Sequence, residues 1–213
     1  VVVVSEYGLV PVDRPIFINR ILRRMGLLSV RRGPFGELLM PGESKAFAVA
    51  DHQLAHVYVN DPSAIDTVRS ELESTPGIEA VFDPGDVELD HTRSGELIAL
   101  AQPDAWFAYY YWDDDRLAPD FARTVDIHRK PGYDPCELFM TSKLRMAGRL
   151  MQKKLGMRYK MDVIPLDPML VRGSHGLHPE PDDGPLIVGP SDSAGLPLDM
   201  RDFPSYVHAL MKN

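Results

Sequence analysis

The sequence has one cysteine, no long apolar run and no methionine at its start. A single cysteine cannot form a disulfide within the chain, so nothing requires an oxidising compartment, and the composition is compatible with the cytoplasm. No apolar run approaches the roughly 20 residues that cross a bilayer, so we expect no membrane partner. Because the chain opens directly on Val1–Val4 with no polar lead-in, we expect a segment of a longer protein.

Positive charge is also scarce. The chain carries 23 Lys and Arg against 31 Asp and Glu, a net charge of -8. A phosphate backbone would be repelled at long range, so the sequence argues against binding a nucleic-acid polymer. With 213 residues, of which 44% are hydrophobic, the chain can bury a sizeable core.

The first 51 residues alternate between strand-like and helical patterns. Four valines without polar alternation predict a strand buried on both faces, as in a parallel sheet. Helical spacing follows from residue 13 to residue 26. Further strand-like runs are separated by Gly/Pro turns, at 27–30, 37–40 and 46–50. This pattern predicts an α/β fold class.

Residues 52–118 have a different rhythm, which predicts a small α+β insertion with one element unaccounted for. It consists of strands at 56–59 and 78–82 around a helix, and then a strand pair at 96–101 and 106–111. The aromatic run in the last strand predicts a core contribution with alternate rings pointing outward. We therefore divide the chain into 1–51, the insertion 52–118, and 119–213.

Two helices are predicted after the insertion. Residues 137–155 form an amphipathic pattern whose methionines are expected to fill the core, and residues 202–211 predict a closing helix.

Two segments have the character of a binding site. One is Ser5-Glu6-Tyr7-Gly8, directly after the first strand, and the other is the glycine-flanked His175 in Arg172-Gly173-Ser174-His175-Gly176. Ligands gather at the carboxyl ends of strands in α/β sheets, and Glu and His are suitable ligands for zinc. The alternatives are a turn cap for Glu6 and a surface loop for His175.

A third segment, residues 126–134, brings opposite charges together. His128, Lys130 and Asp134 could bind a substrate phosphate or brace a metal ligand. The alternative is a solvated loop with an internal ion pair. His52 is also of interest because it lies at the expected junction with the insertion.

Several of these segments resemble a known family in the same order along the chain. VVVVSEYGL is similar to the strand and loop of the alkaline phosphatase superfamily, in the branch of nucleotide pyrophosphatases/phosphodiesterases and phosphonoacetate hydrolase, where aliphatics lead into Ser-Asp-His-Gly-Met. RGSHGLHP resembles that branch's later Gly-x-His-Gly loop. The segments between them, AHVYVNDPSAIDTVRSELESTPGIEAVFD and RSGELIALAQPDAWFAYYYW, resemble its α+β cap.

The resemblance implies a three-layer α/β core with the insertion as a cap, and a hydrolase with two metal ions, usually zinc. It implies a Thr or Ser nucleophile upstream of this chain. By position, Glu6 takes the place of the family's aspartate ligand, Tyr7 that of a histidine ligand, and His175 that of the histidine on the other metal. Tyr7 departs from the pattern, because a phenol binds metal well only as phenolate, which favours a ferric-type ion over zinc.

The leading hypothesis is therefore a metal-dependent hydrolase of phosphate esters, diesters or phosphonates, present as a segment without its nucleophile. Its substrate would be a phosphorylated small molecule. We expect the missing N-terminal half, or an oligomer partner, to cover the first strand. The alternative is a non-catalytic binding module that kept the fold and lost one metal site.

Overall fold

The computed structural model describes residues 1–178, 184, 186–188 and 200–212. The chain divides into two compact units, Pro11–Leu177 and the pair of segments Val1–Val10 and His178–Asn213. Within the described residues, no helix is long and apolar enough to cross a membrane.

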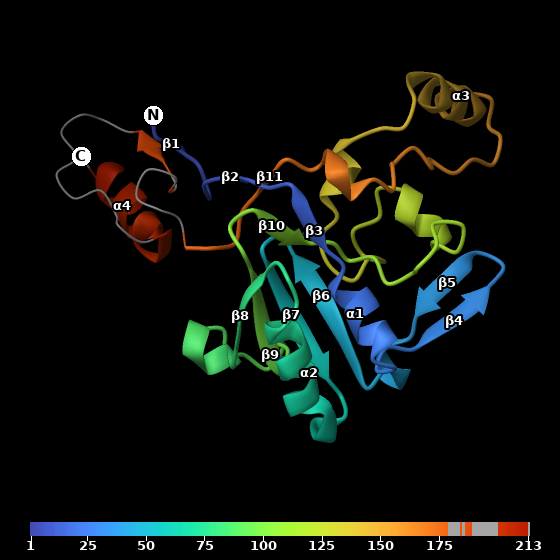
Figure 1. Ribbon diagram of the computed structural model, residues 1–213. Helices are drawn as coiled ribbons and strands as arrows, with labels where there is room; N and C mark the ends of the chain where they lie inside the picture. Colours follow the sequence, from blue (N-terminus) through green and yellow to red (C-terminus); the bar gives the residue numbers. More distant parts are fainter. Residues whose placement is uncertain (179–183, 185, 189–199, 213) are drawn as a thin grey trace. The chain divides into compact units, whose positions relative to one another are not determined.

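The larger unit holds most of the regular structure (Figure 1). Its strands and helices are β3 (Arg14–Ile16), α1 (Ile18–Arg24), β4 (Val30–Gly33), β5 (Gly36–Leu39), β6 (Ala46–Asp51), β7 (Leu54–Val59), α2 (Ile65–Glu73), β8 (Ile78–Phe82), β9 (Leu97–Ala101), β10 (Ala105–Phe107), α3 (Lys143–Lys154) and β11 (Gly173–Ser174). The smaller unit contains β1 (Val3–Val4), β12 (Ile187–Val188) and α4 (Phe203–Leu210), and β2 (Val10–Pro11) lies at the division.

The core of the larger unit is a four-stranded antiparallel sheet in the order β6-β7-β9-β8. Alternate residues of β6 point inward, and these are Ala46, Ala48 and Ala50, all fully buried. They share one apolar cluster with the buried side chains of α1 and α2. Small side chains on the inner face allow the helices to approach the sheet closely. The other face of β6 carries Phe47 and Val49.

Four secondary-structure elements predicted within residues 52–118 are present. β7, α2, β8 and β9 lie at or within one to three residues of the predicted positions. The strand predicted at 46–50 is present as β6, which pairs along β7 from Ala46↔Val59 to Asp51↔Leu54. The hairpin therefore joins the two sides of the proposed boundary at residues 51 and 52. The three-part division stays a prediction.

The strand pair predicted at the end of the insertion is wrong. β10 pairs in parallel with β3, from Ala105↔Arg14 to Phe107↔Ile16, and not with β9. The backbone of Phe107 donates to His52 O, at 2.7 Å, and so leads the aromatic run inward. Residues 106–112 are at most 2% exposed. No ring of this run points outward, because β3, α1 and the β6–β7 hairpin surround it.

The expected burial of the helix at 137–155 is wrong. α3 forms within the predicted range, but none of its residues is buried. The valines of β1 are 62% and 36% exposed, and β1 pairs with β12 in antiparallel orientation. A strand is buried on both faces only where other elements cover it, and periodicity does not say whether they are present. The helix expected at 202–211 is confirmed as α4.

Candidate histidine site

The turn between β6 and β7 holds His52 in an unusual conformation. Its φ is 57°, in the left-handed region that non-glycine residues seldom adopt. The next residue, Gln53, is fully buried and its side chain donates to Pro103 O at 3.1 Å and to Ala105 O at 3.2 Å. These bonds fix the turn, so His52 is held in a defined direction.

The loop that carries His175 lies against this turn. Gln53 N donates to His175 O at 3.0 Å, and the rings of His52 and His175 are 3.9 Å apart at their centroids. Gly176 has a φ of +121°, and a Cβ there would lie 3.3 Å from Gln53 N. Glycine at position 176 thus permits the approach of the two histidines.

A third segment reaches the same place through Gly132. Tyr133 N donates to Ala50 O at 2.8 Å, and the Tyr133 ring stacks on His52 with centroids 4.5 Å apart. A Cβ at Gly132 would lie 2.1 Å from Ala50 O, so only glycine fits this close contact with β6. We refer to Asp51, His52, Tyr133 and His175 as the histidine cluster.

The cluster contains one carboxylate. Asp51 Oδ1 lies 2.8 Å from His52 Nδ1. This hydrogen bond is the main cause that lowers the pKa of the Asp51 carboxyl, and charge on His175 and His56 lowers it further, against partial desolvation. Partial burial lowers the pKa of His56, on the adjacent strand.

The donor types of the cluster suit zinc, which binds imidazole and carboxylate. In the described part of the chain, however, no three His, Cys, Asp or Glu side chains converge as a metal site. The cluster by itself therefore supplies a partial set of donors. Its rings and carboxylate can bind, orient and exchange a proton with a ligand.

Glu6 and Tyr7 lie in the smaller unit, after β1, and both are exposed. His175 belongs to the larger unit. The common ligand set of these three residues stays a prediction.

The predicted substrate residues occupy different environments. His128 is exposed, whereas Lys130 and Asp134 form a buried pair, with Nζ 2.7 Å from Asp134 Oδ2. Glu137 lies 2.6 Å from the same Nζ. The internal ion pair considered from the sequence is present, but it is buried and not solvated. A substrate role for the three residues stays a prediction.

Sequence reasoning singled out His52 but missed Asp51 and Tyr133. The available signal was an acid and a histidine in succession at the end of a strand, and a glycine before the tyrosine. Neither signal identifies its partner, because residues 51, 133 and 175 meet only through tertiary contacts.

Comparison with known families shows to which family the chain belongs. A family model for type I phosphodiesterase / nucleotide pyrophosphatase matches residues 1–134. The chain belongs to this family. The resemblance to the alkaline phosphatase superfamily is thereby confirmed, and the matched region includes Asp51, His52 and Tyr133. His175 lies beyond it.

Two solved structures of phosphonoacetate hydrolase from Sinorhizobium meliloti 1021 show distant similarity. The complex with phosphonoformate is 15% identical with a TM-score of 0.36, covering 50% of this chain and 28% of that chain. The complex with phosphonoacetate is 14% identical with a TM-score of 0.37, covering 55% and 29%. The chain thus spans less than a third of those proteins. TM-scores below 0.5 are too low to carry the assignment, which rests on the family match. No curated protein gives a match.

Proposed function

We propose that this chain is part of a metal-dependent hydrolase of phosphate esters, phosphate diesters or phosphonates. One observation carries the proposal: in a chain of the phosphodiesterase / nucleotide pyrophosphatase family, His175 packs 3.9 Å from His52, which is paired with Asp51. Loops distant in sequence thus bring nitrogen and oxygen donors together. The substrate would be a phosphorylated small molecule.

In this proposal, residues 1–51 and 119–213 contribute to a three-layer core and residues 52–118 to a cap. Glu6, Tyr7 and His175 would hold metal, two zinc ions per complete protein, and a nucleophile would come from upstream sequence. Bound zinc would polarise the phosphoryl oxygens and stabilise the leaving oxygen. His52 would position His175 by ring contact, with its own orientation set by Asp51.

The test is made on the full-length gene product that contains this chain. We expect about two metal ions per chain by elemental analysis, and hydrolysis of 4-nitrophenyl phosphate mono- or diesters. His175→Ala should lower kcat/KM by about 100-fold or more and reduce the metal content, because removal of a ligand weakens the site. Thermal unfolding followed by circular dichroism shows whether the variant remains folded.

The matched control is His91→Ala, an exposed histidine outside the cluster. It should keep the activity and metal content of the wild type. A folded His175→Ala protein with unchanged metal and turnover would reject the role of His175. A wild type with neither metal nor turnover would reject the hydrolase and favour the binding module.

A further inference from the structure

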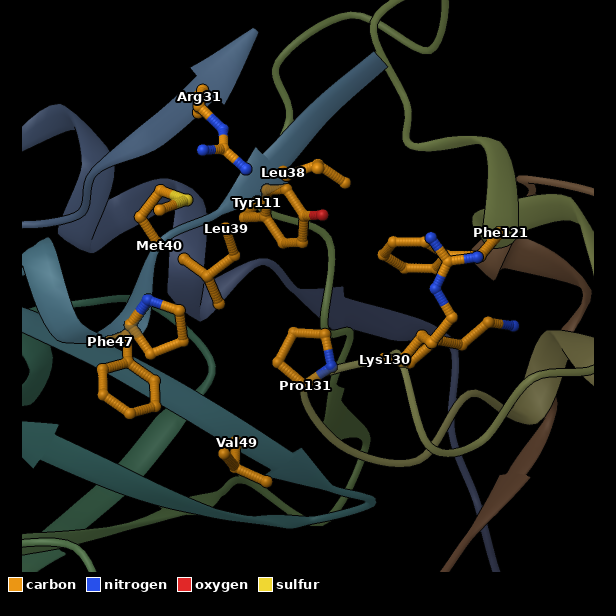
Figure 2. A pocket seen from close by; sticks show the side chains of 12 residues that line it. Arg31, Leu38, Leu39, Met40, Phe47, Val49, Tyr111, Phe121, Lys130 and Pro131 are labelled. Carbon is orange, nitrogen blue, oxygen red and sulfur yellow. The ribbon is translucent and has the colours of Figure 1, made fainter. Parts of the chain in front are cut away.

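A pocket of about 470 Å³ lies in the larger unit, on the outer face of β6. Its apolar lining includes Leu38, Met40, Phe47, Val49, Phe121 and Pro131 (Figure 2). These residues come from β5 and the residue after it, from β6, and from the 121–131 segment. Both the volume and the apolar lining are typical of sites for small organic molecules.

The pocket adjoins the histidine cluster along β6. Side chains alternate in a strand, so Phe47, Val49 and Asp51 follow one another on the same face, about 7 Å apart. Phe47 and Val49 line the pocket, and Asp51 pairs with His52. The 131–133 segment connects them too, because Pro131 lines the pocket and Tyr133 stacks on His52. The pocket and the cluster are therefore neighbours along β6 and along the 131–133 segment.

The opposite side of the pocket carries Arg31, which Figure 2 shows across the pocket from Val49. The other lining cations are already neutralised: Lys130 by Asp134 and Glu137, and Arg129 by Asp120 and Asp126 at 3.6 and 3.8 Å. Within the described residues, Arg31 has no carboxylate at ion-pair distance. Its guanidinium is thus the cation at this pocket that an anionic group on a ligand could pair with.

We infer that this pocket binds the organic group of the substrate, and that this group is an apolar ring or branched chain with an acidic substituent at its far end. The inference rests on the proposed function, because it takes the phosphoryl or phosphonyl group to lie at the histidine cluster. The apolar body then covers Val49 and Phe47. The acidic substituent pairs with Arg31.

Binding of non-hydrolysable phosphonates separates these contributions. Isothermal titration calorimetry of the full-length gene product compares methylphosphonate, benzylphosphonate and 4-carboxybenzylphosphonate. The ring should tighten binding by about 10-fold or more, because it is removed from water. The carboxylate should tighten it by a further several-fold through Arg31. A fourth probe, 4-methylbenzoate, has the ring and acid but no phosphonate.

Two substitutions act on the two parts of the pocket. Val49→Trp fills the apolar part and should abolish the advantage of the ring, and Arg31→Gln should abolish only the advantage of the carboxylate. The controls are Val125→Trp and Arg24→Gln, at exposed positions outside the pocket. Leu38→Trp, on β5, is the second filling variant if Val49→Trp does not fold.

Failure of the inference and failure of the proposed function give different results. The inference alone would be overturned if the wild type hydrolyses phosphate esters but the ring and the carboxylate tighten binding equally in the wild type, in Arg31→Gln and in both filling variants. An inactive protein that binds 4-methylbenzoate, with binding lost in Arg31→Gln and in the filling variants, would overturn the proposed function and keep the pocket. Equal affinity of the wild type for all three phosphonates would also overturn the inference.

Discussion

At the scale of single residues, Lys130 is a charged residue whose side chain is fully buried. Its side chain is 0% exposed and contacts two carboxylates, at 2.7 and 2.6 Å. Burial raises the pKa of the Asp134 carboxyl, and the charge of Lys130 acts in the opposite direction. The ammonium group is thus the main compensation for buried negative charge in this loop.

Lys130→Met should lower the free energy of unfolding by about 3–5 kcal/mol, since it leaves Asp134 and Glu137 without their cation. Urea unfolding at pH 7 measures the change. Lys153→Met, at an exposed site in α3, is the control and should change stability by less than about 0.5 kcal/mol. A Lys130→Met protein of normal stability but weakened substrate binding would favour the substrate role predicted from the sequence.

At the scale of elements, the β4–β5 hairpin is attached to the core through a buried acid. Glu37 is 2% exposed, with Oε2 2.6 Å from Arg23 Nη1 of α1 and Oε1 3.3 Å from Arg32 Nη2. The Tyr111 hydroxyl donates to its carbonyl at 3.2 Å. One carboxylate thus joins the hairpin to α1, and the Glu37 backbone accepts a bond from the aromatic run.

The pKa of Glu37 is lowered chiefly by its hydrogen bond from Arg23. A lowered pKa contributes stability that is present above the unfolded value near 4.5 and is lost as the pH falls through the folded value. Glu37→Gln should therefore destabilise the protein by about 2–3 kcal/mol at pH 7. The difference from wild type should shrink below about pH 4.

Unfolding in urea at several values between pH 3 and pH 7 measures this difference. The control is Glu43→Gln, at an exposed position, which should follow the wild type across the range. A gap between Glu37→Gln and wild type that stays constant with pH would contradict the ion-pair explanation.

At the scale of the whole molecule, two features have opposite effects on association: an exposed apolar segment and a net charge of -8. Leu144 is 86% exposed and Met151 64% exposed on α3, and Leu138 and Leu155 beside the helix are 77% and 68% exposed. Exposed apolar patches of this kind promote association. Net charge opposes it, and salt screens that repulsion.

Replacing both Leu144 and Met151 with Gln should therefore reduce concentration-dependent light scattering at high salt. The free energy of unfolding should change by less than about 0.5 kcal/mol, because neither side chain is buried. The paired substitution Lys143→Gln and Lys153→Gln, on the same helix, is the control and should leave scattering high. A large loss of stability in the Leu144/Met151 variant would mean that α3 packs against part of the whole protein.

The patterns of the sequence predicted most elements of the larger unit, because strand and helix formation depend on local alternation and turn residues. β8 extends over the predicted residues 78–82, and α3 lies within the predicted 137–155. The sequence predicted less well which elements pair or pack together. The β10 run is strand-like but pairs with β3, and α3 has the periodicity of a buried helix although none of its residues is buried.

The sequence by itself determined family membership, through residues 1–134, and the residue types available for a metal site. It also placed a glycine at 132, where a Cβ would collide with β6, and a glycine at 176, where the backbone φ is +121°. The tertiary structure alone decided that Asp51, His52, Tyr133 and His175 meet, and that an apolar pocket with Arg31 adjoins them. The contacts of His52 with Tyr133 and His175 join residues 81 and 123 positions apart, and these partners are fixed by packing of the sheet and loops, which no local pattern encodes.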